Sequence, residues 1–126
     1  MRSCITSLCS LIALTAVGSA PIDLYCWIVA DDRGSTQHSV TSVSNDVDEL
    51  NKIFTQVGMS FTVLSISFTN STHLTNIVLT NDQQIAELCS ITNATGGLEL
   101  YFVKTISNDA NAFWVPSGIA VSSAHN

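Results

Sequence analysis

Two segments in the first half of the chain have the hydrophobic pattern of β-strands. Residues Leu24 to Ala30 are continuously apolar and rich in strand formers, which predicts a strand buried on both faces. From Met59 to Thr69 apolar and polar residues alternate, and the alternation slips by one residue between Val63 and Leu64. This second segment predicts a strand with one less buried face and a β-bulge at the slip.

The segment between these two strands follows a helical period instead. Its apolar residues share one helical face, and they are Val47, Leu50, Ile53, Phe54 and Val57. Acidic residues occupy the predicted first turn, where they oppose the positive end of the helix dipole, and Ser44 or Asn45 is the expected N-cap. We expect a helix from about Asn45 to Val57, ended by Gly58. A strand, a helix and a strand with short connections predict a right-handed crossover between parallel strands.

The second half of the chain predicts a short helix, Asp82 to Ser90, and three more strands. The run from Leu98 to Ile106 is apolar, aromatic and β-branched, and a shorter run covers Gly118 to Ser122. The brief run Ala112 to Val115 ends at Pro116, and a proline in this place suits an edge strand. The predicted fold is α/β, with a mostly parallel twisted sheet of about five strands, an antiparallel edge strand and one long helix packed on a face.

The composition indicates one folded domain that does not bind nucleic acid. The chain has 126 residues, of which 46% are hydrophobic and 11% are charged, a balance typical of a globular protein. Its net charge is −6. Phosphate binding needs clustered lysine and arginine, whereas the basic residues here are scattered, so we expect no nucleic-acid partner. They are Arg2, Arg33, Lys52 and Lys104.

Residues 1–20 have the layout of a secretory signal. Arg2 precedes a mostly apolar stretch from Ile5 to Val17, and small residues follow at positions 18–20. The apolar stretch is shorter than the roughly 20 residues that a membrane-spanning helix needs, so no membrane span is predicted. We expect cleavage after the small residues, a secreted or extracytoplasmic protein, and one domain over residues 21–126. The alternative is a misplaced start whose translated flank is apolar by chance.

Cys26 and Cys89 are the cysteines outside the predicted leader. In an oxidising compartment the two can form one disulfide. The alternative is a pair of small buried thiols, which are common in protein cores. No CxxC spacing is present in the sequence, so neither a zinc ribbon nor a thioredoxin-like site is predicted.

The sequence contains none of the common catalytic or phosphate-binding motifs. A GxSxG elbow, a Gly-rich phosphate loop and a histidine pair at helical spacing are all missing from the 126 residues. Asp31, Asp32 and His38 follow the first strand without a known ligand spacing, so a solvated turn is expected there. His73 is predicted to lie on the surface without a partner, and Glu99 to be a solvated carboxylate. We therefore predict no catalytic residue and no metal ligand within this chain.

Three segments together resemble the metzincin-type zinc peptidases. The stretch Asn45 to Phe61, with Gln56-Val57-Gly58 at the helix end, resembles the first helix of that family and the turn into its second strand. Leu98 to Thr105 resembles the third strand, and Gly118 to Ser123 resembles the strand before the active-site helix. In that family the motif HExxHxxGxxH follows, in which three histidines hold zinc and the glutamate activates water. The resemblance implies hydrolysis of a peptide or protein substrate.

The resemblance also leads us to expect an incomplete and inactive metallopeptidase domain. The sequence ends at Asn126 before any HExxH motif, and no ligand role is assigned to His125 because glutamate does not follow it. Zinc is expected in the intact family domain and not in this chain. Without the helix that carries the motif, an exposed apolar patch is expected on one sheet face. Its candidate residues are Tyr101, Val103, Ile119 and Val121.

A substrate-binding edge is the one functional feature that the resemblance places within the chain. In metzincins the segment between the third strand and the strand before the active-site helix binds substrate antiparallel to itself, by strand addition. That segment corresponds here to Ala112, Phe113, Trp114 and Val115. The alternative is that Phe113 and Trp114 only cover the sheet edge. The alternative function, from a different class, is a secreted non-catalytic α/β binding module.

Overall fold

The computed structural model describes residues 21–93 and 95–123. The predicted leader at residues 1–20 and His125 lie outside the described residues. The strands are β1 (Pro21–Ala30), β2 (Ser60–Asn70), β3 (Asn76–Ile77), β4 (Leu98–Val103), β5 (Thr105–Ile106), β6 (Ala112–Val115) and β7 (Gly118–Ser122). The helices are α2 (Val40–Phe54) and α3 (Asp82–Cys89), and the 3₁₀ turns are η1 (Thr55–Val57), η2 (Thr72–Leu74) and η3 (Ser107–Asp109).

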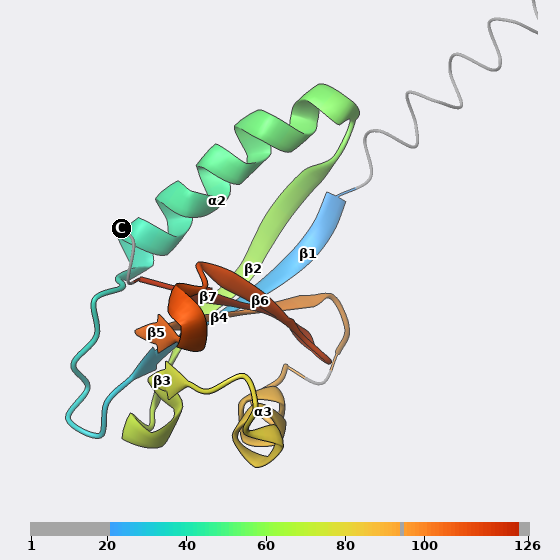
Figure 1. Ribbon diagram of the computed structural model, residues 1–126. Coiled ribbons are helices and arrows are strands. Elements are labelled where there is room, and N and C mark those ends of the chain that lie inside the picture. The colour runs from blue at the N-terminus through green and yellow to red at the C-terminus, as the bar shows by residue number, and fades with distance from the viewer. Residues whose placement is uncertain (1–20, 94, 124–126) are drawn as a thin grey trace, which may run out of the picture.

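Five of the strands form one mixed sheet, in the order β2-β1-β4-β7-β6 (Figure 1). β1 pairs in parallel with β2 and β4, and β4 pairs in parallel with β7. β6 lies at one edge and is antiparallel to β7. The predicted α/β fold, with a mostly parallel sheet, an antiparallel edge strand and one long helix, is confirmed. One predicted strand is shorter, because the run from Leu98 to Ile106 breaks at Lys104 and β5 pairs with β3 in a separate two-stranded sheet.

The predicted β-bulge in β2 is present. The register between β1 and β2 shifts between Leu24 and Tyr25, and Leu64 is left without a partner on β1. Val63 and Ile66, which are three residues apart, both pack against the same hydrophobic cluster. Regular alternation would turn them to opposite faces, so the extra residue keeps the apolar positions of β2 on one side of the sheet.

α2 begins at Val40 and not at Asn45 as predicted. The amide of Ser42 donates a hydrogen bond to Oγ of Ser39 at 3.0 Å, and the amide of Ser39 donates to Oγ of Ser42 at 2.8 Å. This capping box satisfies two backbone donors at the helix start. The predicted cap at Ser44 or Asn45 is therefore wrong, because the acidic residues that suggested a first turn lie inside the helix.

The two helices cover opposite faces of the sheet (Figure 1). The α2 cluster combines Val43 and Val47 with residues of β1 and β4, which are Leu24, Cys26, Ile28, Leu100 and Phe102. The α3 cluster combines Leu88 with residues of several strands, among them Val29, Tyr101, Val103, Ile106, Val115 and Ala120. Alternate residues of β1 and β4 thus enter two different clusters, as expected for strands buried on both faces.

The α3 cluster buries two of the four residues that were predicted to form an exposed apolar patch. Tyr101 and Val103 are fully buried in it, so the prediction that they are exposed is wrong. The short helix α3 and the small β3-β5 sheet cover this face through Leu88, Ile77 and Ile106. Ile119 and Val121 lie on the α2 face and are half-buried.

Glu99 is buried within the fold and is not a solvated carboxylate as predicted. Its Oε2 accepts a hydrogen bond from the indole Nε1 of Trp27 at 2.6 Å. Its Oε1 accepts from Thr92 Oγ1 at 2.9 Å, from the amide of Asn93 at 3.0 Å and from Nδ2 of Asn93. This network joins the loop between α3 and β4 to the neighbouring strands β1 and β4.

Cys26 and Cys89 belong to opposite sides of the sheet. Cys26 lies in the α2 cluster, Cys89 packs against the α3 cluster, and both are free cysteines. The structure therefore does not form the predicted disulfide, because the sheet separates the two side chains. The alternative, a pair of buried thiols, holds for Cys26, whereas Cys89 is only half-buried.

The two thiols are expected to differ in reactivity. Burial, with a smaller effect from Glu99, raises the pKa of the Cys26 thiol to about 11. Because the thiolate is the reactive form, iodoacetamide at pH 8 should label Cys89 in the native protein and leave Cys26 unmodified. Peptide mass mapping measures this, and unfolding in urea should make both thiols reactive. Equal labelling of Cys26 in native protein would contradict its buried position.

Candidate functional site

β6, the predicted substrate-binding segment, forms an exposed edge of the sheet. Within residues 21–93 and 95–123 this strand pairs with β7 alone. Phe113 is 37% exposed and Trp114 is 70% exposed, whereas Val115 is buried. The structure thus places the four predicted residues on one strand, with both aromatic side chains open to solvent. We call this strand and its outer side the β6 edge.

The backbone of β6 presents hydrogen-bonding groups on the side away from β7. The amide of Ser122 donates to the carbonyl of Asn111 at 2.8 Å, which makes this a bonded pair of the β6-β7 ladder. Bonded and non-bonded pairs alternate in an antiparallel ladder. The N–H and C=O groups of Ala112 and Trp114 therefore point out of the sheet edge. An extended polypeptide can pair with these groups.

Trp114 also forms one wall of an apolar cavity on the α2 face. The cavity has a volume of about 320 Å³ and extends from α2 across the sheet to β6. Its lining residues are Ile22, Leu24, Leu50, Phe54, Met59, Phe61, Leu98, Leu100, Trp114 and Ile119. α2 lies along β2 and β1 and leaves the β6 side of this face open (Figure 1). The apolar surface of the β6 edge therefore continues onto the sheet face.

The opposite sheet edge, β2, is less suited to strand addition. Nδ2 of Asn51 donates to the carbonyl of Phe61 at 2.9 Å, and the amide of Phe61 donates to Oδ1 of Asn51 at 2.7 Å. The helix thereby occupies backbone groups at the start of this edge. Farther along, the bulge at Leu64 interrupts the regular spacing of outward groups, as bulges do at protected edges.

The described residues do not fit a zinc site. Among the side chains that the structure describes, which leave out that of Asp109, no three His, Cys, Asp or Glu come together as metal ligands. His38 is buried, with Nε2 3.1 Å from the carbonyl of Val103 and its ring edge-on to Phe102. The prediction that His38 is part of a solvated turn is therefore wrong. His73 is on the surface as predicted, but its Nε2 lies 3.2 Å from the carboxylate of Glu87, a partner that the sequence did not reveal.

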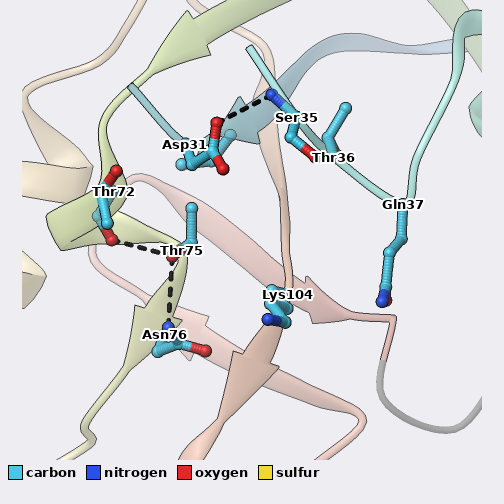
Figure 2. A pocket seen from close by; sticks show the side chains of 9 residues that line it. Asp31, Ser35, Thr36, Gln37, Thr72, Thr75, Asn76 and Lys104 are labelled. Carbon is cyan, nitrogen blue, oxygen red and sulfur yellow. Dashed lines mark hydrogen bonds between the residues drawn. The ribbon is translucent and has the colours of Figure 1, made fainter. Parts of the chain in front are cut away.

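A second cavity, of about 240 Å³, is polar and lies beyond the carboxyl ends of β1, β2 and β4 (Figure 2). We call it the polar cavity, and its lining residues are Val29, Asp31, Ser35, Thr36, Gln37, Thr72, Thr75, Asn76 and Lys104. No motif or spacing in the sequence predicted this site. The available signal was the polar residues that directly follow neighbouring parallel strands, since the carboxyl ends of such strands meet at one edge of the sheet.

Comparison with known proteins does not place the chain in a family. No protein-family model matches the sequence, and no curated protein matches it. Among the helices that the structure describes, none is long and apolar enough to cross a membrane. The case for a function therefore depends on the geometry of the β6 edge and of the two cavities.

Proposed function

We propose that the chain binds an extended polypeptide along the β6 edge, as the substrate-binding part of a metzincin-like zinc peptidase domain. The observation that carries this proposal is the outward backbone of Ala112 and Trp114 beside an aromatic side chain that is 70% exposed. A polypeptide that runs antiparallel to β6 would extend the sheet by one strand. Its side chains on the α2 face would meet Trp114 and Ile119 at the open end of the apolar cavity.

The position of β6 in the sheet supports the link to metzincins. β6 lies in sequence between β4 and β7, and it is the antiparallel strand at the edge beside β7. This is the place that the resemblance assigns to the substrate-binding segment. The zinc chemistry of that family needs a histidine motif that the 126 residues do not contain. We therefore assign binding to the described residues and no step of hydrolysis.

The alternative, a secreted non-catalytic binding module, uses the same surface. In both proposals the β6 edge holds an extended segment of another protein. They differ in whether zinc-dependent cleavage follows binding in a chain that also has the histidine motif. Binding by this chain is therefore the property to test first.

Replacing Ala112 by proline is expected to weaken peptide binding by about tenfold, which equals about 1.4 kcal/mol. Proline lacks the outward N–H, and its ring obstructs the approaching strand. The β6-β7 hydrogen bonds remain, because the lost donor points away from β7. The probe is a fluorescein-labelled tryptic digest of casein, titrated with the full chain and followed by fluorescence anisotropy. Urea unfolding of the variant checks that the fold is kept.

Phe68→Ala is the matched control, because Phe68 is an aromatic residue on the β2 edge and is 52% exposed. Its affinity for the digest should stay within about twofold of the wild-type value. Equal loss in Ala112→Pro and Phe68→Ala, or no loss in a folded Ala112→Pro protein, would contradict binding at β6. The casein peptides should remain uncleaved in mass spectra, and chelator-sensitive cleavage would refute binding without hydrolysis.

A further inference from the structure

We propose that the polar cavity is a binding site for a small organic carboxylate that also carries hydroxyl or ammonium groups. β1 and β2 are neighbouring parallel strands whose onward connections lead to opposite faces of the sheet, to α2 after β1 and to α3 after β2. The two loops diverge and leave a crevice between them. Open α/β sheets bind ligands in such crevices, outside the carboxyl ends of the strands.

Side chains from three segments surround this crevice (Figure 2). Thr36 and Gln37, from the loop after β1, stand on one side, and Thr72 and Asn76, from the segment after β2, stand on the other. Lys104, directly after β4, lies between them. Residues that are far apart in the sequence therefore converge on one small volume.

The rim of the polar cavity is held in place by local hydrogen bonds. Oδ1 of Asp31 accepts from the amides of Arg33 at 2.9 Å and Ser35 at 2.8 Å. The amide of Asp32 donates to Oγ1 of Thr72 at 2.9 Å, and the amide of Thr72 donates to Oδ1 of Asp32 at 3.0 Å. The two loops are thus tied to each other, which pre-organises the site for a ligand.

The two amide side chains of the polar cavity have their oxygen atoms engaged by the protein. Oε1 of Gln37 accepts from Ser123 Oγ at 2.7 Å, and Oδ1 of Asn76 accepts from Thr105 Oγ1 at 2.7 Å. Nδ2 of Asn76 uses one of its two hydrogens on Thr75 Oγ1 at 3.2 Å. The groups that these side chains can still offer a ligand are N–H donors. Such donors favour a ligand with oxygen acceptors.

Lys104 adds a positive charge to these donors. Its backbone is fixed, because its amide donates to the carbonyl of Thr75 at 2.8 Å and its carbonyl accepts from Ser122 Oγ at 3.1 Å. Among the side chains that the structure describes, which do not include that of Asp109, its ammonium group has no hydrogen-bond or ion-pair partner. A cation on a fixed backbone beside N–H donors suits a carboxylate.

The charge of Asp31 and the volume of the polar cavity restrict the ligand class further. Asp31 places a carboxylate in the same cavity. The negative charge of this carboxylate disfavours a doubly charged phosphate. Its oxygen atoms can accept hydrogen bonds from a hydroxyl or ammonium group of the ligand. The volume of about 240 Å³ is smaller than the roughly 300–1,000 Å³ of sites for drug-sized ligands. A ligand with the size of an amino acid or a sugar acid is therefore expected.

The test is a titration of the ¹⁵N-labelled full chain, followed by NMR, with L-glutamate and D-gluconate as separate probes. At least one of the two should give saturable shifts at the amides of Ser35, Thr72 and Lys104. Lys104→Gln should weaken this binding by about tenfold or more, because the charged partner of the carboxylate is lost. Lys52→Gln should leave the affinity unchanged, because Lys52 lies on α2 and pairs with Glu49.

Three results would overturn the proposal. The first is the absence of localised shifts with either acid up to about 10 mM, a concentration above a weak millimolar Kd. The second is unchanged affinity in a Lys104→Gln protein whose spectrum otherwise overlays that of the wild type. The third is equal affinity for inorganic phosphate, which would show an unselective anion site and not a carboxylate site. The peptide-binding assay does not depend on these outcomes, because Lys104 lies outside the β6 edge.

Discussion

Replacing Gly118 by alanine is expected to lower the free energy of unfolding by about 4 kcal/mol or more, the range reached by the most damaging single substitutions. A Cβ atom on Gly118 would lie 1.8 Å from the carbonyl oxygen and 2.7 Å from the carbonyl carbon of Glu99. Both are backbone atoms of the neighbouring strand, in register with Gly118. The clash can be relieved only by moving β4 and β7 apart, and β7 connects β6 to the rest of the sheet.

Urea unfolding followed by circular dichroism measures this loss. Gly96→Ala is the matched control, since a Cβ built there meets no atom within 4 Å apart from those of its chain neighbours. Its positive φ of 100° still makes alanine unfavourable by about 1–2 kcal/mol. A small and equal loss in both variants would contradict the close approach of β7 to β4. A domain of this size has a total stability of about 5–15 kcal/mol, so the Gly118 variant should lose a large fraction of its stability and unfold at a much lower urea concentration than the wild type.

Replacing Glu99 by leucine is expected to cost about 3 kcal/mol, because its half-buried partners Trp27 and Asn93 lose their acceptor. The indole N–H of Trp27 and the amide of Asn93 would both lose their hydrogen bonds. Glu99→Gln should cost less, about 1–2 kcal/mol, since the side-chain amide keeps one acceptor oxygen. The measurement is again the urea midpoint, with the indole N–H resonance of Trp27 in the NMR spectrum as a second probe of the site.

Glu49→Gln provides the control for the loss of a carboxylate at the surface. Glu49 lies on α2 and pairs with Lys52 at 2.6 Å, with both side chains largely exposed. Exposed ion pairs contribute roughly 0–1 kcal/mol, so this variant should unfold close to the wild type. If Glu99→Leu were as stable as Glu49→Gln, the buried network would have no role in holding the loop between α3 and β4.

The elements that the sequence predicted well are those with a strong local pattern. The continuous apolar run of β1 and the slip between Val63 and Leu64 were enough to predict a buried strand and a bulge. Pro116 after a short apolar run marked β6 as an edge strand. The start of α2 was missed because two local signals compete, and the serine pair Ser39 and Ser42 forms the cap ahead of the acidic turn.

The features that the sequence did not reveal depend on contacts between distant segments. Glu99 bonds to Trp27, and His38 bonds to the carbonyl of Val103, although each pair lies far apart in the chain. No periodicity within one element encodes such a partner. The polar cavity was missed for the same reason, because nothing local marks Thr72 and Lys104 until the sheet places the strands before them, β2 and β4, on either side of β1.

The most direct test of polypeptide binding at β6 is amide hydrogen exchange, measured by NMR on the full chain with and without saturating casein peptides. Strand addition should slow exchange at Ala112 and Trp114, whose N–H groups point out of the sheet edge, and leave Phe68 on β2 unchanged. Unchanged exchange at Ala112 and Trp114 in the saturated complex, or protection at Phe68 instead, would contradict the proposal.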